Sequence, residues 1–187
     1  WSSDVCSSDL EVLLKAYRAR PVEGEQLSAI VKLLAERAGL AHPPALYVIP
    51  SMTLNAFATG KPDHAAIAVT EGLVRRLTLR EIAGVLAHEI SHVTHKHTVN
   101  AIRKSKAVQL GANETLSNRA PLLDRLANKA YEIVLENNFN RDDELDADKT
   151  AGALTQKAGY APGALGTFLT RLADRNKDQA EKNGLFA

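Results

Sequence analysis

A five-residue pattern with a histidine at each end, His88-Glu89-Ile90-Ser91-His92, constrains this chain more than any other feature of its sequence. The pattern lies in a run whose apolar residues recur at helical spacing from Leu79 to Val93. Thr78 and Glu81 form a capping box at the start of that run, in which each side chain can accept from the other residue's backbone N–H. We therefore expect both histidines on one face of a capped amphipathic helix, one turn apart.

Two imidazoles in this arrangement can hold one metal ion from the same side. Zinc suits such a pair because it accepts nitrogen ligands in a tetrahedral shell. Glu89 directly follows the first histidine, so its carboxylate would lie beside a bound ion, where it could take a proton from water. The competing interpretation is a surface helix that carries two incidental histidines.

A catalytic zinc ion also needs a third protein ligand and one open position. One group of zinc enzymes takes a third histidine from the same segment, after a glycine that ends the helix. The corresponding positions here are His95 and Thr98, which disfavours that arrangement. A cysteine ligand is also disfavoured, because the single cysteine, Cys6, lies in an atypical N-terminal segment. The remaining option is a carboxylate from a second helix.

An acidic segment farther along the chain can supply that carboxylate. A helix is predicted over residues 141–158, and Glu144 and Asp148 lie four residues apart on one of its faces. Glu144 is the candidate third ligand, and Asp148 could accept a hydrogen bond from the far nitrogen of a ligand histidine. The alternative is a solvated acidic first turn, favoured by the helix dipole. Three further aspartates are assigned to the solvated face: Asp142, Asp143 and Asp146.

Two more histidines follow the pattern without a definite role. His95 would lie one turn beyond His92, near the metal-facing side, where it could help to polarise a substrate. For His95 and His97 alike, we favour a solvent-exposed histidine at a helix end. A donor that would stabilise an oxyanion is not selected by the sequence, and the candidates are Tyr131, Asn137 and Asn138.

The rest of the chain predicts a small sheet among helices. Apolar residues at helical spacing predict a helix over residues 26–38, which Gly39 would end. Three strands are expected at residues 45–49, 55–59 and 65–70, with residues 60–64 connecting the last two. Further helices are expected at residues 10–19, 101–111 and 121–136, and from Pro162 onwards.

Composition narrows the class of protein. Of the 187 residues, 45% are hydrophobic and 24% are charged, which is typical of a globular domain and not of a disordered chain. A net charge of +1 without a basic stripe gives no sign of a nucleic-acid partner. No apolar run approaches the ~18 residues that a membrane-spanning helix needs. Residues 1–10, WSSDVCSSDL, have no hydrophobic period and are expected to be an artefactual or tag-like segment.

Four segments of the chain resemble, in order, the blocks of the HtpX-like and CAAX-prenyl-protease-like zinc peptidases, family M48 of the gluzincin group. They are Asn-Ala-Phe-Ala-Thr-Gly at 55–60, Val-Thr-Glu-Gly-Leu at 69–73, Gly-Val-Leu-Ala-His-Glu-Ile-Ser-His at 84–92, and Glu-Leu-Asp-Ala-Asp at 144–148. The similarity extends from about Tyr17 to the end of the chain. Four blocks in this order are more specific than the histidine pattern alone.

The resemblance implies an α+β, predominantly helical fold, with a small three- to four-stranded sheet packed on the active-site helix. It implies one Zn²⁺ ion held by His88, His92 and Glu144, with Glu89 as the catalytic base and Asp148 bonded to a ligand. It also implies an edge strand that binds extended peptide by strand addition. The candidate residues for that strand are Asn55, Ala56, Phe57 and Ala58, and the alternative is a plain core strand.

The expected function is a zinc metalloendopeptidase that hydrolyses unfolded or extended proteins, in protein quality control of the cell envelope. The alternative is a zinc-binding, chaperone-like homologue that holds misfolded proteins without cutting them. HtpX-type members carry membrane helices between their two zinc motifs, whereas residues 101–140 here are polar. We therefore expect a chain closer to the soluble, envelope-associated members. Residues 11–187 are expected to be a catalytic domain truncated at its C-terminus, with an anchor or further domain left open.

Overall fold

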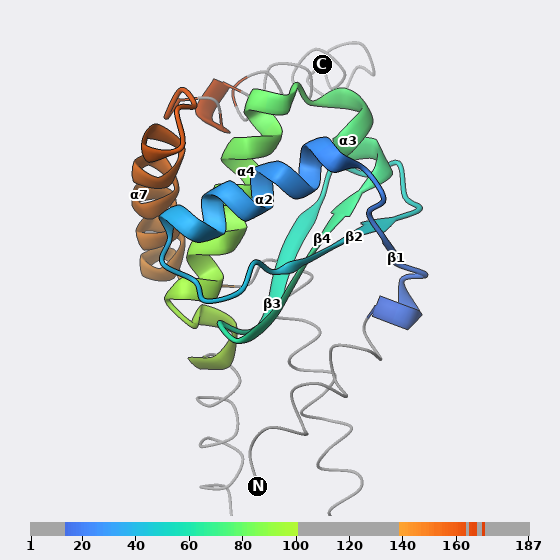
Figure 1. Ribbon diagram of the computed structural model, residues 1–187, viewed down its shortest axis with the longest axis horizontal. Coiled ribbons are helices and arrows are strands. Elements are labelled where there is room, and N and C mark those ends of the chain that lie inside the picture. Colours follow the sequence, from blue (N-terminus) through green and yellow to red (C-terminus); the bar gives the residue numbers. More distant parts are fainter. Residues whose placement is uncertain (1–13, 101–138, 164, 168–169, 171–187) are drawn as a thin grey trace, which may run out of the picture.

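The computed structural model describes residues 14–100, 139–163, 165–167 and 170, and Figure 1 shows how their elements are arranged. In chain order the elements are β1 (Arg20–Pro21), α2 (Glu25–Arg37), β2 (Ala45–Ile49), β3 (Ala56–Lys61), β4 (His64–Thr70), α3 (Glu71–Arg76), α4 (Leu79–Thr94) and α7 (Arg141–Lys157). The predicted α+β class, with a small sheet beside helices, is confirmed.

The four strands form one mixed sheet in the order β1-β2-β4-β3. Strand β2 pairs parallel with β4, while β1 with β2 and β3 with β4 are antiparallel pairs. The prediction of residues 45–49 as a strand agrees with β2, and the other two predicted strands agree with β3 and β4 within two residues. Strand β3 lies at an edge of the sheet, as the sequence led us to expect.

The connection between β3 and β4 is shorter than predicted. Residues 60–64 were expected to link the strands, but only Pro62 and Asp63 form the turn, between the paired residues Lys61 and His64. Gly60 makes this possible, because its φ is +99° and a Cβ there would lie 2.2 Å from the carbonyl oxygen of His64. The glycine therefore continues the strand and allows the backbones to approach closely.

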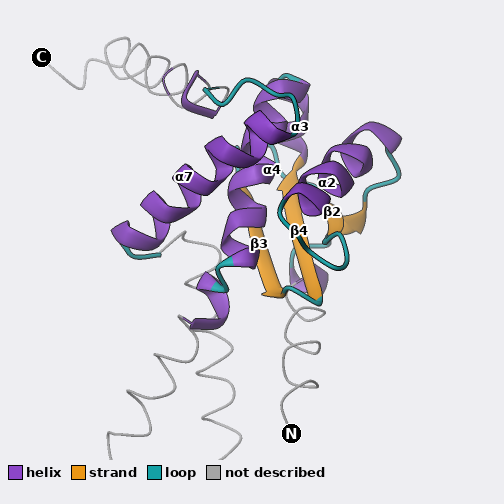
Figure 2. Cartoon of the chain, turned by 60° about the vertical axis from the view of Figure 1, so that its left-hand side comes forward, coloured by secondary structure: helices purple, strands orange, loops and turns teal. Residues whose placement is uncertain are grey.

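Helix α4 is the central element of the fold. The predicted capping box is present: the Thr78 N–H donates to Oε2 of Glu81 at 2.8 Å, and the Glu81 N–H donates to Oγ1 of Thr78 at 3.3 Å. Figure 2 shows α4 between α7 on one side and strands β3 and β4 on the other. Its side chains are buried almost all the way round, as expected of a helix enclosed by other elements.

Helix α2 covers another side of α4 and closes the core. Its inward face carries Ile30, Val31 and Leu34, which join the side chains of α4 and the sheet in one apolar cluster. Burying a leucine or isoleucine of this kind contributes about 1.5–3 kcal/mol. The helix ends as predicted at Gly39, whose φ is +74°.

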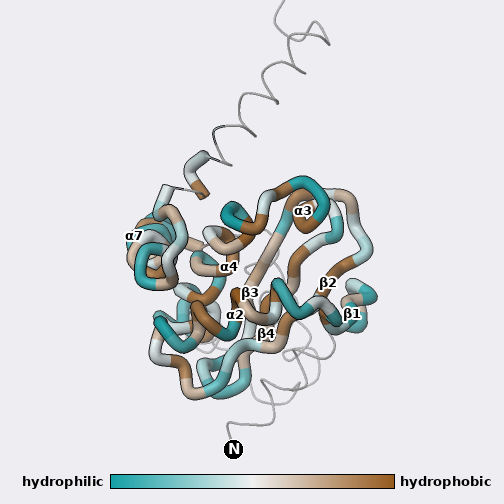
Figure 3. The backbone as a smooth tube through the Cα atoms, turned by 45° about the horizontal axis from the view of Figure 1, so that its top comes forward, coloured by the Kyte–Doolittle hydropathy of each residue, from teal (hydrophilic) through white to brown (hydrophobic). Residues whose placement is uncertain are grey.

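Helix α7 matches the segment predicted as the acidic helix. Asn140 caps its first turn, because its Oδ1 accepts from the Asp143 N–H at 2.8 Å. Gly159, with φ +80°, follows its end. Figure 3 shows α7 as largely hydrophilic, and its narrow buried side, which includes Ala147 and Ala151, faces the core.

Several predicted elements lie outside the described residues. They are the helices at 101–111 and 121–136, most of the helix after Pro162, and the start of the helix at 10–19, of which residues 14–16 are helical. Residues 1–10 also lie outside. Within the ranges that the structure describes, no helix is both long enough and apolar enough to cross a membrane.

The surroundings of Gly72 in α3 and of Gly152 in α7 predict opposite effects of a Gly→Ala substitution on stability. A Cβ at Gly72 would lie 2.3 Å from the carbonyl oxygen of Met52, so Gly72→Ala should destabilise the protein by about 2–3 kcal/mol. A Cβ at Gly152, inside α7, meets nothing within 4 Å, so Gly152→Ala should stabilise it by about 0.5–1 kcal/mol. Urea unfolding of both variants measures these free energies. Equal effects would contradict the close approach of the 51–53 segment to α3.

Candidate metal centre

Three predicted ligand side chains converge between α4 and α7. Nε2 of His88 lies 3.0 Å from Nε2 of His92 and 3.3 Å from Oε2 of Glu144, while Nε2 of His92 lies 3.7 Å from Oε1 of Glu144. Two ligand atoms of a tetrahedral zinc ion lie about 3.3 Å apart when each is about 2.0 Å from the metal. The three side chains therefore have the composition and spacing to hold one such ion.

Asp148 lies where the sequence predicted it. Its Oδ1 is 2.9 Å from Nδ1 of His88, on the side of the ring away from Glu144. If His88 Nδ1–H donates to this carboxylate, the lone pair of Nε2 points toward His92 and Glu144. The pair fixes both the orientation of the His88 ring and the nitrogen that is available to a metal ion.

The ionisation of the cluster is governed by burial and by neighbouring carboxylates. Burial opposes a charge on His88, but its hydrogen bond to Glu144 and the charges of Glu89, Glu144 and Asp148 outweigh this and raise its pKa to about 9. Burial and the neighbouring His88 lower the pKa of His92. The hydrogen bond from His88 lowers the pKa of Glu144, against the effect of burial. Without a metal, His88 thus carries the positive charge that balances Glu144.

Glu89 lies beside this cluster and is 7% exposed. Burial raises its pKa to about 7; the neighbouring His88 and a hydrogen bond from the Ala58 backbone act in the opposite direction. A carboxyl group with a pKa near 7 can take up and release a proton near neutral pH. Glu89 and the edge strand β3 therefore meet within the same site.

Strand β3, the candidate substrate-binding strand, lies at the edge of the sheet, but some of its outward-facing backbone groups already have hydrogen-bond partners. The Asn55 carbonyl accepts from the Thr70 N–H at 3.0 Å, so Asn55 pairs inward, toward β4, and lies just before β3. The Ala58 backbone bonds outward instead, to Glu89 and to the hydroxyl of Thr98. Alternation along an antiparallel strand directs the backbone groups of Ala56 outward as well. The side chains of Ala56, Phe57 and Ala58 are buried, as in a core strand.

The expectation that His97 is solvent-exposed is wrong. It is 6% exposed, and its Nδ1 lies 3.0 Å from Nδ1 of His92. Lys96 has a φ of +58°, which ends α4 and turns the chain so that His97 returns to the site. Phe139, which the sequence did not single out, stacks on the His92 ring with centroids 4.3 Å apart.

The assignment to a solvated face holds for Asp142 and Asp146, which are exposed, whereas Asp143 is partly buried. Oδ2 of Asp146 contacts Nδ1 of His95, and His95 is accordingly half-buried at the end of α4. The Asp143 N–H donates to Oδ1 of the capping Asn140, and Oδ2 of Asp143 accepts from Nδ2 of Asn140. Three side chains here form a second group that could hold a cation, namely His95, His97 and Asp146.

The oxyanion candidates Tyr131, Asn137 and Asn138 lie outside the described residues.

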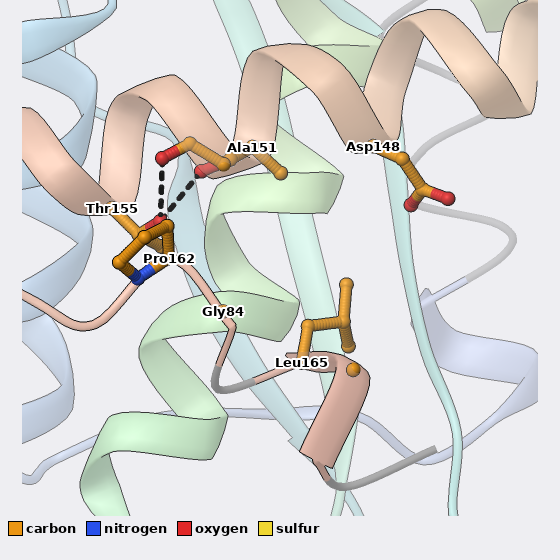
Figure 4. Close-up of a pocket in the computed structure, with 8 residues that line it drawn as sticks. Gly84, Asp148, Ala151, Thr155, Pro162 and Leu165 are labelled. Carbon is orange, nitrogen blue, oxygen red and sulfur yellow. Dashed lines mark hydrogen bonds between the residues drawn. The ribbon is translucent and has the colours of Figure 1, made fainter. Parts of the chain in front are cut away.

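A small pocket of about 160 Å³ opens between α4 and α7 beside Asp148 (Figure 4). Gly84 lines it from α4, one turn before His88, and Ala151 lines it from α7. A Cβ at Gly84 would lie 3.0 Å from the backbone nitrogen of Leu165. Glycine at position 84 therefore allows the backbone at Leu165 to approach α4 closely.

Known proteins are similar to this chain in sequence and in fold. The model of the family described as "Peptidase family M48" matches residues 21–186. A "Protease HtpX homolog" of Acaryochloris marina is 38% identical, and the match covers 94% of this chain and 64% of that protein. A second one, from Campylobacter curvus, is 36% identical, with 83% and 61% covered. "Protease HtpX" of Legionella pneumophila is 48% identical over 53% of this chain and 34% of its own length.

The chain thus spans less than two thirds of the length of these relatives. Among solved structures, Ste24p of S. mikatae is similar, with a TM-score of 0.51 at 24% identity, over 79% of this chain and 44% of that one. At this level of identity the similarity supports the same fold.

The raised pKa of Glu89 predicts a pH-dependent cost of burying its charge. Because its pKa is about 7 when folded and 4.5 in the unfolded reference, protonated Glu89 favours the folded state, and this contribution is lost as the pH rises from 4.5 through 7. In the presence of a chelator, the free energy of unfolding of the original chain should therefore fall between pH 4.5 and 8. That fall should be about 3 kcal/mol larger than the fall in the Glu89→Gln variant. Urea unfolding at both pH values measures this, and parallel losses would refute it.

Proposed function

The chain belongs to peptidase family M48, and on this premise we propose that it is a zinc metalloendopeptidase. The observation that carries the proposal is the convergence of His88, His92 and Glu144, with Glu89 buried beside them. The relatives that match the chain are named as proteases, which supports the same chemistry here. Because these relatives are longer than this chain, peptidase activity must be tested on this chain itself.

In the proposed site, Nε2 of His88, Nε2 of His92 and the carboxylate of Glu144 hold one zinc ion. Their spacing of 3.0–3.7 Å supports this assignment. Asp148 orients His88 through the 2.9 Å contact with its Nδ1. When bound, zinc supplies a Lewis acid that activates water and polarises a carbonyl oxygen.

Glu89 is the proposed general base. It removes a proton from the attacking water and then delivers that proton to the leaving amine. Without a bound ion its pKa is about 7, so this carboxyl group can both take up and release a proton near neutral pH. The hydrogen bond from the Ala58 backbone holds the carboxyl group against the sheet edge, where a peptide would lie.

We place the substrate along the outer edge of β3, as an extended chain. The candidate residues are Asn55, Ala56, Phe57 and Ala58. Ala56 offers outward backbone groups, whereas those of Ala58 already have partners, so pairing is expected at the Asn55–Ala56 end. An extended strand can be supplied by an unfolded protein, which agrees with a role in quality control of envelope proteins.

Replacing the proposed base separates binding from catalysis. Glu89→Gln keeps the shape of the side chain but cannot take a proton, so it should bind zinc like the original chain and lose at least about 100-fold in peptidase activity. Zinc content by mass spectrometry and digestion of unstructured casein, with and without chelator, measure the two properties. Full activity in this variant would contradict the role of Glu89. A zinc-loaded original chain that holds casein without cutting it would support the chaperone-like alternative.

Strand addition also predicts a preference for unfolded substrates. A disulfide-bonded protein, once reduced and alkylated, should be cleaved, while the same protein in its native form should resist, because its peptide bonds are not available as an extended strand. Gel analysis of both digests under one condition gives the comparison. Equal cleavage of the two forms would argue against recognition by the β3 edge.

A further inference from the structure

His97 has no part in the function proposed above, yet it contacts a proposed metal ligand. It is buried, and its Nδ1 lies 3.0 Å from Nδ1 of His92. The rings meet edge to face, with centroids 5.0 Å apart and planes inclined at 74°. A hydrogen bond between two ring nitrogens needs a hydrogen on one of them and a lone pair on the other. This contact therefore couples the tautomers of the two histidines.

Metal binding at His92 decides the direction of that hydrogen bond. A metal ion uses the lone pair of Nε2, so a neutral His92 carries its hydrogen on Nδ1. Nδ1 of His97 must then accept, and neutral His97 carries its own hydrogen on Nε2. That nitrogen faces two carboxylates, with Oδ2 of Asp146 at 3.7 Å and Oδ1 of Asp143 at 3.9 Å. Their negative charge favours a hydrogen at that position.

We propose that His97 is a positioning residue, which holds His92 in the tautomer and orientation that zinc requires. The inference rests on the proposed function, since it takes His92 as a metal ligand. His97 would do for His92 what Asp148 does for His88, because each contacts the Nδ1 of a ligand ring. Asp148 is a carboxylate near the surface, whereas His97 is an uncharged acceptor in the interior.

Two features of the surrounding structure hold the rings of His97 and His92 in place. Helix α4 ends at Thr94, and the left-handed conformation of Lys96, two residues later, directs His97 back toward His92. Phe139 stacks on the His92 ring with an interplanar angle of 23°. The His92 ring is thus held on its face by Phe139 and at its Nδ1 edge by His97.

The alternative is a second metal site, because the ligand atoms of His95, His97 and Asp146 lie within 4.8 Å of one another. A cation on Nε2 of His97 would put the hydrogen of that ring on Nδ1. Nδ1 would then donate to His92, whose hydrogen would move to Nε2 and block the lone pair that zinc needs. The two ions would exclude one another across this hydrogen bond, so we expect one tightly bound zinc ion for each chain.

Two substitutions of equal shape test the proposal. In His97→Asn, the amide oxygen can take the position of ring Nδ1 and accept from His92. In His97→Leu, a methyl group takes that position and cannot accept. We expect His97→Leu to weaken zinc binding by about 10–100-fold and His97→Asn to retain most of the affinity.

Competition with a chromophoric chelator at one pH measures zinc affinity, and the visible spectrum of the Co²⁺-loaded protein reports ligand geometry. As a control, the free energy of unfolding of both variants is measured in the presence of chelator. A purely structural role of His97 would lower this free energy by similar amounts in His97→Asn and His97→Leu.

Equal losses of zinc affinity in the two variants, or no loss in His97→Leu, would overturn the role of His97 while leaving the metal centre intact. A second tightly bound zinc ion that Asp146→Asn removes would also overturn it. If His92→Ala binds zinc as tightly as the original chain, the proposed metal centre itself is wrong, and this inference falls with it.

Discussion

The close contact between α4 and α7 is the interaction on which the site depends. Helix α4 presents two imidazoles one turn apart, and α7 brings Glu144 within 3.3 Å of the first. The same contact places Asp148 against His88 from the opposite side. Gly84 and Ala151 line a small pocket beside this contact. Neither helix alone carries a complete ligand set.

The sheet supports this contact from the other side of α4. The side chains of Ala56, Ala58 and Ala65 lie in the same apolar cluster as those of α4, and these small residues leave room for the helix to pack against the sheet. This arrangement puts Glu89 between the ligand cluster and the edge strand, where the Ala58 backbone bonds it. Its burial raises its pKa, so a feature of the packing also sets the chemistry of the carboxyl group.

Local signals in the sequence predicted the framework well. The capping box at Thr78 and Glu81 begins α4, and Gly39 ends α2, because each depends on residues adjacent in the chain. The convergence of Glu144 on His88 and His92 followed from ligand chemistry, and the structure brings these residues together, although their roles stay a prediction.

Sequence reasoning missed features that depend on tertiary structure. The return of His97 requires Lys96 in a left-handed conformation, which a lysine gives no signal for. The contact between Asp146 and His95 joins α7 to the end of α4, and the two residues are 51 positions apart in the sequence. Strand β3 was expected at an edge, but the bonds that occupy Ala58 come from α4 and from Thr98, and no local pattern predicts them.

X-ray absorption of the zinc-loaded chain tests the central claim most directly, because it reports the atoms bound to the metal. The account predicts a shell of two imidazole nitrogens and two oxygens at about 2.0–2.2 Å, one oxygen from Glu144 and one from water. In Glu144→Gln the spectrum should change while both imidazoles remain. A sulfur ligand at about 2.3 Å, a third imidazole, or a spectrum unaffected by Glu144→Gln would contradict a metal centre built by α4 and α7 together.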